Sequence, residues 1–187
     1  IDLPSGLTNL GSSALGYTGI TSVIIPDGVK TIEDHVFAGC SRLNSITFSD
    51  SIAAIGNYAF LDCCNLNNVS IPSSIKSIGD GAFSGCSSLT SIILPNGITK
   101  IEDSAFYNCS GLTSVTIPSS VTSIGTTAFM GCTGLTSIIV DKDNMYYDSR
   151  DNCNALIQTS NSCLLAGCSN TKIPKTVKRI YDGAFQG

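Results

Sequence analysis

Short stretches in which apolar and small polar residues alternate recur along the chain. In one of them Ser114-Val115-Thr116-Ile117 is followed directly by Pro118. A short strand with one buried face has this alternation. Proline has no amide hydrogen to give to a sheet and therefore ends a strand. The pattern predicts a series of short strands, and prolines stand at the equivalent place in three other stretches: Pro26, Pro72 and Pro95.

The stretches belong to a repeat of 23 residues. After each strand comes a second short apolar piece, such as Val121-x-x-Ile124, and then an Ala-Phe pair in a segment too short for more than one or two helical turns. A unit of this length cannot bury its own apolar face, so we expect successive units to stack equivalent side chains in ladders. The interval is kept by Phe37, Phe60, Phe83, Phe106 and Phe129, by Cys40, Cys63, Cys86, Cys109 and Cys132, and by matching sets of leucine and isoleucine.

The repeat is irregular at its start. Leu3-Pro4 lies 22 residues before Ile25-Pro26, and Ala14-Leu15 replaces the usual Ala-Phe pair. We therefore expect residues 1–187 to form one solenoid domain whose first coil, at about 1–19, is degenerate and acts as an N-terminal cap.

The repeat is also interrupted near its end, where Phe129 and Phe185 are 56 residues apart. This spacing predicts an enlarged coil at about 141–170. Apolar pieces at 154–158 and 163–166 flank a polar turn and predict a β-hairpin that projects from the stack. A two-residue turn at Ser160-Asn161 would place Cys153 opposite Cys168, which suggests a disulfide between them.

The stretch Ile78-Gly79-Asp80-Gly81-Ala82-Phe83-Ser84-Gly85-Cys86, preceded by a Leu-x-x-Leu-x-Leu-type opening, resembles the BspA-like, or Treponema-type, leucine-rich repeats. The resemblance spans nearly the whole chain. It implies a right-handed leucine-rich-repeat solenoid of α/β-type repeats, mostly β, with a parallel sheet on the concave face and short helical or irregular turns on the other. It also implies a secreted or cell-surface protein associated with adhesion, and the family has no catalytic residues to carry over.

Composition excludes several other classes of protein. The chain carries a net charge of -4, only 13% of its residues are charged, and it has no run of Lys or Arg. This argues against nucleic-acid binding and against binding to an anionic membrane. The apolar runs are far shorter than the roughly 20 residues of a membrane-spanning helix, so we expect no membrane insertion. The chain lacks a signal-peptide pattern and stops in mid-repeat, so we expect it to be a fragment of a longer protein.

The reactive residue types form no recognisable catalytic or metal site. Five of the nine cysteines follow the repeat, which favours small buried hydrophobes over metal ligands, while Cys64 is expected to be an exposed thiol. His35, the only histidine, is interpreted as a convex-surface residue. No triad or zinc site can be assembled around it, so we expect no enzyme, metal or cofactor. The acidic pairs Glu33-Asp34 and Glu102-Asp103 are interpreted as solvated charges or as acids at a helix N-terminus.

The outward positions of the strands are the best candidates for a binding surface. In a parallel solenoid they form continuous rows, and three isoleucines in a field of Ser and Thr suggest a protein contact. Ordinary β-propensity at exposed strand positions is the alternative. One row is Ser22, Ser45, Asn68, Ser91, Ser114, Ser137 and Asn170, and the other is Ile24, Thr47, Ser70, Ile93, Thr116, Ile139 and Lys172.

The sequence therefore predicts a non-catalytic interaction or adhesion module. Its partner would be a protein, either a host matrix protein or another surface protein, with the sheet face and the hairpin as contact regions. A structural spacer that carries another domain or anchor is the main alternative. A glycan-active enzyme is a remote one, because the strand face carries no carboxylate pair where a sugar would lie.

Overall fold

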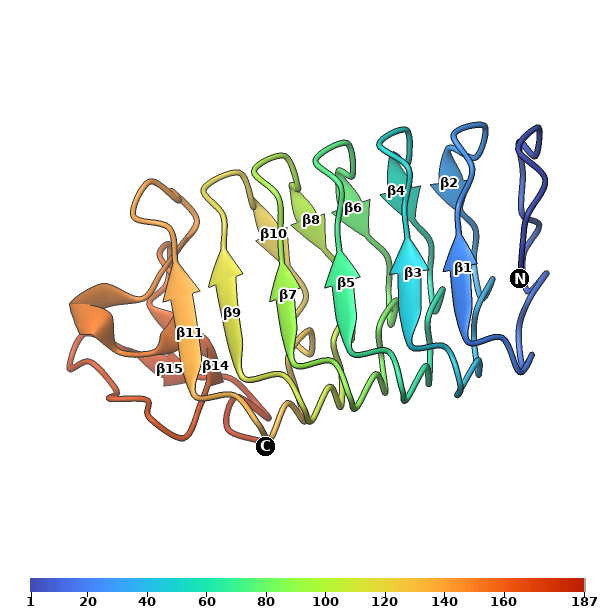
Figure 1. The fold of residues 1–187 in the computed structure, drawn as a ribbon. Coiled ribbons are helices and arrows are strands. Elements are labelled where there is room, and N and C mark those ends of the chain that lie inside the picture. Colours follow the sequence, from blue (N-terminus) through green and yellow to red (C-terminus); the bar gives the residue numbers. More distant parts are fainter. Residues whose placement is uncertain (187) are drawn as a thin grey trace.

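The computed structural model describes residues 1–186, which wind into a solenoid of stacked coils (Figure 1). One side of each regular coil contributes a strand to a six-stranded parallel sheet. Equivalent residues pair directly, as Val23 does with Ile46, so the register follows the 23-residue repeat. In spatial order the strands are β1 (Ser22–Ile24), β3 (Ser45–Thr47), β5 (Asn68–Ser70), β7 (Ser91–Ile93), β9 (Ser114–Ile117) and β11 (Ser137–Val140).

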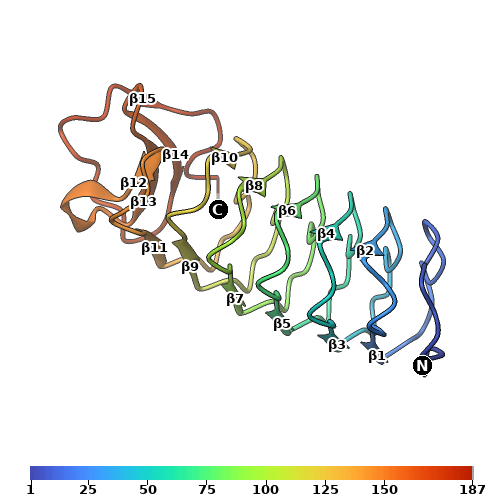
Figure 2. The same ribbon diagram turned by 90° about the horizontal axis from the view of Figure 1, so that it is seen from above.

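The second apolar piece of each repeat forms a second parallel sheet, which runs along the opposite side of the stack (Figure 2). Its strands have only two residues each, and the isoleucine of each strand is buried. The sequence pattern identified these apolar pieces but not their pairing. The strands are β2 (Thr31–Ile32), β4 (Ala54–Ile55), β6 (Ser77–Ile78), β8 (Lys100–Ile101) and β10 (Ser123–Ile124).

The Ala-Phe segment of each coil consists of hydrogen-bonded turns. Backbone hydrogen bonds join neighbouring coils here, as between the Phe37 amide and the Ala59 carbonyl at 2.8 Å. Residues such as His35 and Tyr58 have φ near +60°, a left-handed backbone conformation that an α-helix does not contain. The irregular turns allowed by the sequence are therefore present, and Glu33-Asp34 stands at no helix N-terminus.

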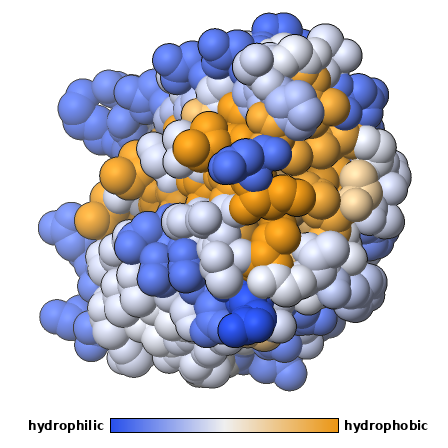
Figure 3. Space-filling view, turned by 45° about the vertical axis from the view of Figure 1, so that its right-hand side comes forward, coloured by the Kyte–Doolittle hydropathy of each residue, from blue (hydrophilic) through white to orange (hydrophobic). Residues whose placement is uncertain are grey.

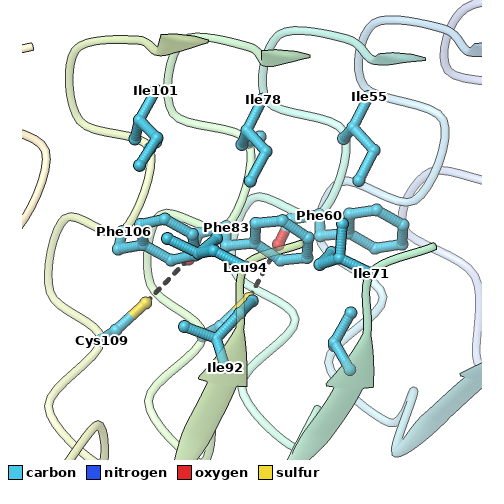
Figure 4. Close-up of a cluster of buried hydrophobic side chains, with 14 of the residues drawn as sticks. Ile55, Phe60, Ile71, Ile78, Phe83, Ile92, Leu94, Ile101, Phe106 and Cys109 are labelled. Atoms are coloured by element: carbon cyan, nitrogen blue, oxygen red, sulfur yellow. Dashed lines mark hydrogen bonds between the residues drawn. The ribbon is translucent and has the colours of Figure 1, made fainter. Parts of the chain in front are cut away.

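The core is built from ladders of identical side chains. The rings of Phe60 and Phe83 stack with their centroids 5.1 Å apart, and those of Phe83 and Phe106 are 5.6 Å apart and nearly parallel. Figure 4 shows this phenylalanine ladder beside the isoleucine ladder. All these rings are fully buried, which confirms the stacking that the repeat predicts.

The first coil has no strand and joins the stack through backbone hydrogen bonds. The amides of Ser13 and Tyr17 donate to carbonyls of the next coil, which are those of Asp34 and Ala38. Leu10 is buried, whereas Leu3 and other leucines of this coil are only partly covered. Figure 3, in which this end comes forward, shows the resulting apolar surface.

The enlarged coil forms a third sheet with the strand order β12 (Tyr147–Asp148), β13 (Ala155–Gln158), β14 (Cys163–Gly167) and β15 (Arg179–Ile180). A short 3₁₀ helix, η1 (Arg150–Asn152), precedes β13. Strands β13 and β14 are antiparallel, which confirms the predicted hairpin. Strand β15 pairs with β14 in parallel.

The expectation that the hairpin projects from the stack is wrong. Leu156 and Leu165 join the main core, while Ile157 and Leu164 pack in a smaller cluster with Ala184. Both faces of the hairpin carry apolar side chains, so burial of both lowers the free energy more than projection into water. The hairpin therefore lies between the last regular coil and the segment that ends the described chain.

The expected seventh strand of the large sheet does not form. Asn170 and Lys172 lie outside any strand, and the amide of Lys172 donates to the Cys153 carbonyl. The Asn170 side chain bonds just before β11, where its Nδ2 donates to the Thr136 carbonyl at 3.2 Å. Strand β13 of the enlarged coil lies beside β11, where the seventh strand was expected. Lys172 therefore does not belong to the outward row.

Candidate binding surface

The structure brings the predicted outward residues together on one face of the six-stranded sheet, with the exceptions of Asn170 and Lys172. In each strand the first and third residues are at least partly exposed and the residue between them is buried. Equivalent exposed residues of successive strands therefore form two parallel rows of outward side chains. Ser137 is half-buried and the others are exposed. The residues on this face are Ser22, Ile24, Ser45, Thr47, Asn68, Ser70, Ser91, Ile93, Ser114, Thr116, Ser137 and Ile139.

Three large apolar side chains stand out from this face. Ile24, Ile93 and Ile139 are 68%, 78% and 51% exposed. Neighbouring strands in a sheet are about 4.8 Å apart, so Ile93 and Ile139, two strands apart, lie roughly 10 Å from each other. The remaining outward positions carry Ser, Thr or Asn, and none carries a charge. The face can therefore offer separated apolar contacts within a neutral field of hydroxyl groups.

A rigid layer supports this face. The residues between the outward positions, such as Val23, Ile92 and Val115, point into the core and are almost fully buried. Thr113 and Thr136 each donate a side-chain hydrogen bond to the carbonyl of the equivalent residue one coil earlier, at 3.1 and 3.2 Å. The backbone that carries the outward rows is therefore fixed by core packing of the buried residues and by hydrogen bonds at the start of the strands.

A polar groove that the sequence reasoning missed runs along the start of the strands. It encloses about 420 Å³ and is lined by Thr21, Arg42, Asn44, Asn65, Asn67 and Ser88. Among the described residues Arg42 has no ion-pair partner. The signal was present in the repeat, because Arg42 and Asn65 occupy positions that carry glycine in later coils.

The ladder cysteines are structural. Four of the five thiols donate to a phenylalanine carbonyl of the preceding coil, as Cys109 Sγ does to Phe83 at 3.1 Å (Figure 4), and Cys40 Sγ donates to the Leu15 carbonyl of the first coil. Burial raises the pKa of the Cys86 thiol well above its ordinary value, and burial raises that of Cys132 to about 12. Protonated, buried thiols are poor nucleophiles and poor metal ligands. Cys64 is exposed, as the sequence predicts.

The expected disulfide between Cys153 and Cys168 is not formed, and both residues are free thiols. Near the turn Ile157 pairs with Leu164, but further along the hairpin Leu156 pairs with Ala166, so the register shifts by one residue at a bulge. A one-residue shift takes Cys168 out of direct opposition to Cys153. Cys168 Sγ instead donates to the Asn154 carbonyl at 3.4 Å.

The other candidate groups serve the turns. His35 stacks on the Tyr58 ring with a centroid separation of 5.2 Å. Asp34 accepts a hydrogen bond from the Asn57 amide, and so ties its own coil to the next one.

Within residues 1–186 no group of three or more His, Cys, Asp or Glu side chains is placed to hold a metal ion. The described part of the chain also contains no helix long and apolar enough to cross a membrane.

Solved structures of several bacterial proteins resemble this fold. A leucine-rich cell surface protein from Faecalibacterium prausnitzii is 42% identical, with a TM-score of 0.63 over 65% of this chain and 32% of that protein. A leucine-rich repeat protein from Treponema pallidum is 27% identical, with a TM-score of 0.66 over 74% of this chain and 71% of that one. The pneumococcal vaccine antigen PcpA, at 24% identity, shares the fold, with a TM-score of 0.71 over 86% of this chain and 41% of its own.

The chain thus spans about a third of the length of the Faecalibacterium protein. No curated protein matches it. The family model for the BspA type leucine rich repeat region matches in six copies over residues 8–136 and 54–187. Together with the stacked 23-residue coils, this match shows that the chain belongs to the BspA-type leucine-rich-repeat family.

Proposed function

We propose that this chain is an adhesion module of a secreted or cell-surface protein, and that it binds a protein ligand through the outward face of the six-stranded sheet. The observation that carries the proposal is the exposure of Ile24, Ile93 and Ile139 on an uncharged, rigid face. Membership of a repeat family found in bacterial cell-surface proteins supports it. The ligand would be a host matrix protein or another surface protein.

The physical basis of binding would be broad contact with little electrostatic steering. Each isoleucine would lose water on entering an apolar pocket of the partner, and the surrounding hydroxyl groups would form the polar rim. A preformed sheet loses little conformational entropy on binding. Because the two rows carry no charge, we expect the affinity to depend weakly on salt concentration. The proposal involves no catalysis, metal or cofactor.

The double substitution Ile93→Asp and Ile139→Asp tests this surface. Both side chains are exposed, so the variant should fold, while the added carboxylates would need to be desolvated in any contact with a partner. Adhesion to a panel of host matrix proteins should fall at least tenfold. A matched control, Ser73→Asp with Asn96→Asp, adds the same charge at exposed turn positions away from the sheet face and should keep adhesion.

The enlarged coil is tested separately. Its hairpin is buried, so its accessible apolar side chains are those of the preceding loop, where Met145 is 84% and Tyr146 51% exposed. A Met145→Asp and Tyr146→Asp variant that loses adhesion, while the sheet variant keeps it, would move the contact to this loop. If both folded variants adhere as well as the parent chain, the module acts as a spacer and the proposal is wrong.

A further inference from the structure

The second sheet stops at β10, and a hollow lies beyond that strand. After Tyr147 the chain no longer follows the 23-residue coil. The strands that lie beyond β10 are therefore β14 and β15 of the third sheet. A space of about 250 Å³ separates Ile124 of β10 from Cys163 of β14 and Arg179 of β15. We refer to this space as the β10–β15 pocket. It lies on a different side of the molecule from the outward rows of the large sheet.

The floor of the β10–β15 pocket is apolar. Ile124, Cys163 and Leu165 line it, and their side chains are only 7%, 3% and 7% exposed. These residues are held in place by the core, because all three belong to the main cluster of buried side chains. An apolar group of a ligand would cover this floor and displace water from it.

The rim of the pocket is rich in hydrogen-bond donors. The Arg179 guanidinium lies over the Tyr181 ring at 5.3 Å, a contact that orients it. Asn161 donates to Gln158 Oε1 at 2.8 Å, which leaves the Gln158 Nε2 protons for another acceptor. Among the described residues Arg179 has no carboxylate partner. The rim thus offers a cation and an amide donor to an anionic group.

The segment that contributes Arg179 to the pocket differs in charge from the rest of the chain. Residues 171–187 contain four of the ten basic side chains and only one of the 14 acidic ones, although the net charge of the chain is -4. Lys178, next to Arg179, is also exposed and unpaired within the described residues. On this side of the pocket the two cations favour an anion, whereas the Asp103 carboxylate, which accepts from Thr126 at 3.5 Å, lies by another part of the lining.

We propose that the β10–β15 pocket binds an apolar group that carries a carboxylate. The apolar part covers Ile124, Cys163 and Leu165, and the carboxylate pairs with Arg179, whose planar guanidinium matches its geometry. A pocket of about 250 Å³ is smaller than the roughly 300–1,000 Å³ of drug-sized sites, so it takes a group of about one residue. Two sources have this chemistry: a free small acid and the C-terminal residue of a peptide.

The test uses the whole 187-residue chain with N-acetyl-leucine as the acid and N-acetyl-leucinamide as its uncharged match. Binding is followed by amide chemical shifts in two-dimensional NMR titrations. The acid should shift the signals of Cys163, Leu165 and Arg179, and the amide should bind at least tenfold more weakly. Arg179→Gln should weaken binding of the acid by a similar factor. Lys175→Gln removes an equal charge from an exposed residue that does not line the pocket, and should have little effect.

A hexapeptide that ends in leucine, compared with its C-terminal amide, distinguishes the two sources. If the peptide acid binds, the pocket takes a chain terminus, and if only N-acetyl-leucine binds, it takes free acids. The proposal is overturned if neither acid shifts the pocket signals at millimolar concentration. It is also overturned if the acid and amide bind equally, or if Arg179→Gln and Lys175→Gln have the same effect in variants that melt at the parent temperature.

Discussion

The backbone amide of Ile124 donates a hydrogen bond to the phenol oxygen of Tyr147 over 2.8 Å. Ile124 lies on β10, the last strand of the second sheet, and Tyr147 follows it by one 23-residue repeat. The tyrosine thus stands where earlier coils carry isoleucine, and its hydroxyl satisfies an amide on the sheet edge. Burial raises the pKa of Tyr147, so it remains a neutral phenol at neutral pH.

We expect Tyr147→Phe to destabilise the chain by about 1–3 kcal/mol, because the buried Ile124 amide would lose its acceptor. Urea denaturation monitored by circular dichroism measures the change. Tyr146→Phe, at a half-exposed neighbour, is the control and should change stability by less than about 0.5 kcal/mol. Equal effects of the two substitutions would contradict an edge-capping role for Tyr147.

Asn144 is a buried polar residue at a position that is apolar in the preceding coils. Its Nδ2 donates to the carbonyls of Pro118 and Val121, and its Oδ1 accepts from the amides of Tyr146 and Tyr147. We expect Asn144→Leu to lower the free energy of unfolding by about 2–4 kcal/mol, although it restores an apolar residue of similar size. Thermal denaturation measures this, with Asn96→Leu at an exposed turn as control. A stabilised Asn144→Leu variant would show that the position favours the apolar ladder.

Phe83 lies at the middle of the stacked rings and is fully buried. Phe83→Ala should cost about 3–5 kcal/mol through lost burial and the cavity left between two coils. Because a solenoid is stabilised by interfaces between neighbours, we expect faster amide hydrogen exchange mainly in the two adjacent coils. Phe185→Ala, at a 44% exposed ring, should cost less. A loss below about 1 kcal/mol for Phe83→Ala in denaturant melts would contradict its burial.

The buried thiols predict how stability depends on alkaline pH. Burial raises the pKa of Cys132 to about 12, whereas an unfolded thiol has a pKa of about 8.5. Above pH 8.5 the unfolded chain releases this proton and the folded chain keeps it. The stabilising contribution is therefore complete below pH 8.5 and is lost as the pH rises towards 12, by at most about 1.4 kcal/mol per pH unit. Cys132→Ala should lose stability less steeply than the parent chain between pH 9 and 11, as measured by urea melts. Parallel curves would contradict the raised pKa.

The free thiols of the hairpin can be checked by mass. With Cys153 and Cys168 unpaired, the intact mass of the purified chain should not change when a reductant is added. In the native chain an alkylating reagent should modify the exposed Cys64 before the buried ladder cysteines. A gain of two hydrogens on reduction that is lost in Cys168→Ser would restore the disulfide that the hairpin pattern suggested.

The 23-residue spacing of Phe37 and its copies was sufficient to determine the solenoid, the ladder core and the outward rows of the large sheet from β1 to β11, but not their end, where the expected seventh strand is missing. Each coil packs on its neighbours in the same way, so equivalent residues of different repeats have the same surroundings. If Ile93 points outward, Ile24 and Ile139 are therefore expected to point outward as well. The two-residue strands of the second sheet were not predicted, because a piece such as Ser77–Ile78 is too short for a periodic signal.

Only the tertiary structure decided how the enlarged coil is placed. The apolar residues Leu156 and Leu164 predict a hairpin, but which face packs on the stack depends on what covers the other face, and here Ala184 and its neighbours do so. The bulge in β14 sets the register, which a turn pattern does not specify, and it separates Cys168 from Cys153. The β10–β15 pocket likewise joins residues 124 and 179, whose separation is not a whole number of 23-residue repeats, since it arises where the enlarged coil breaks the stack.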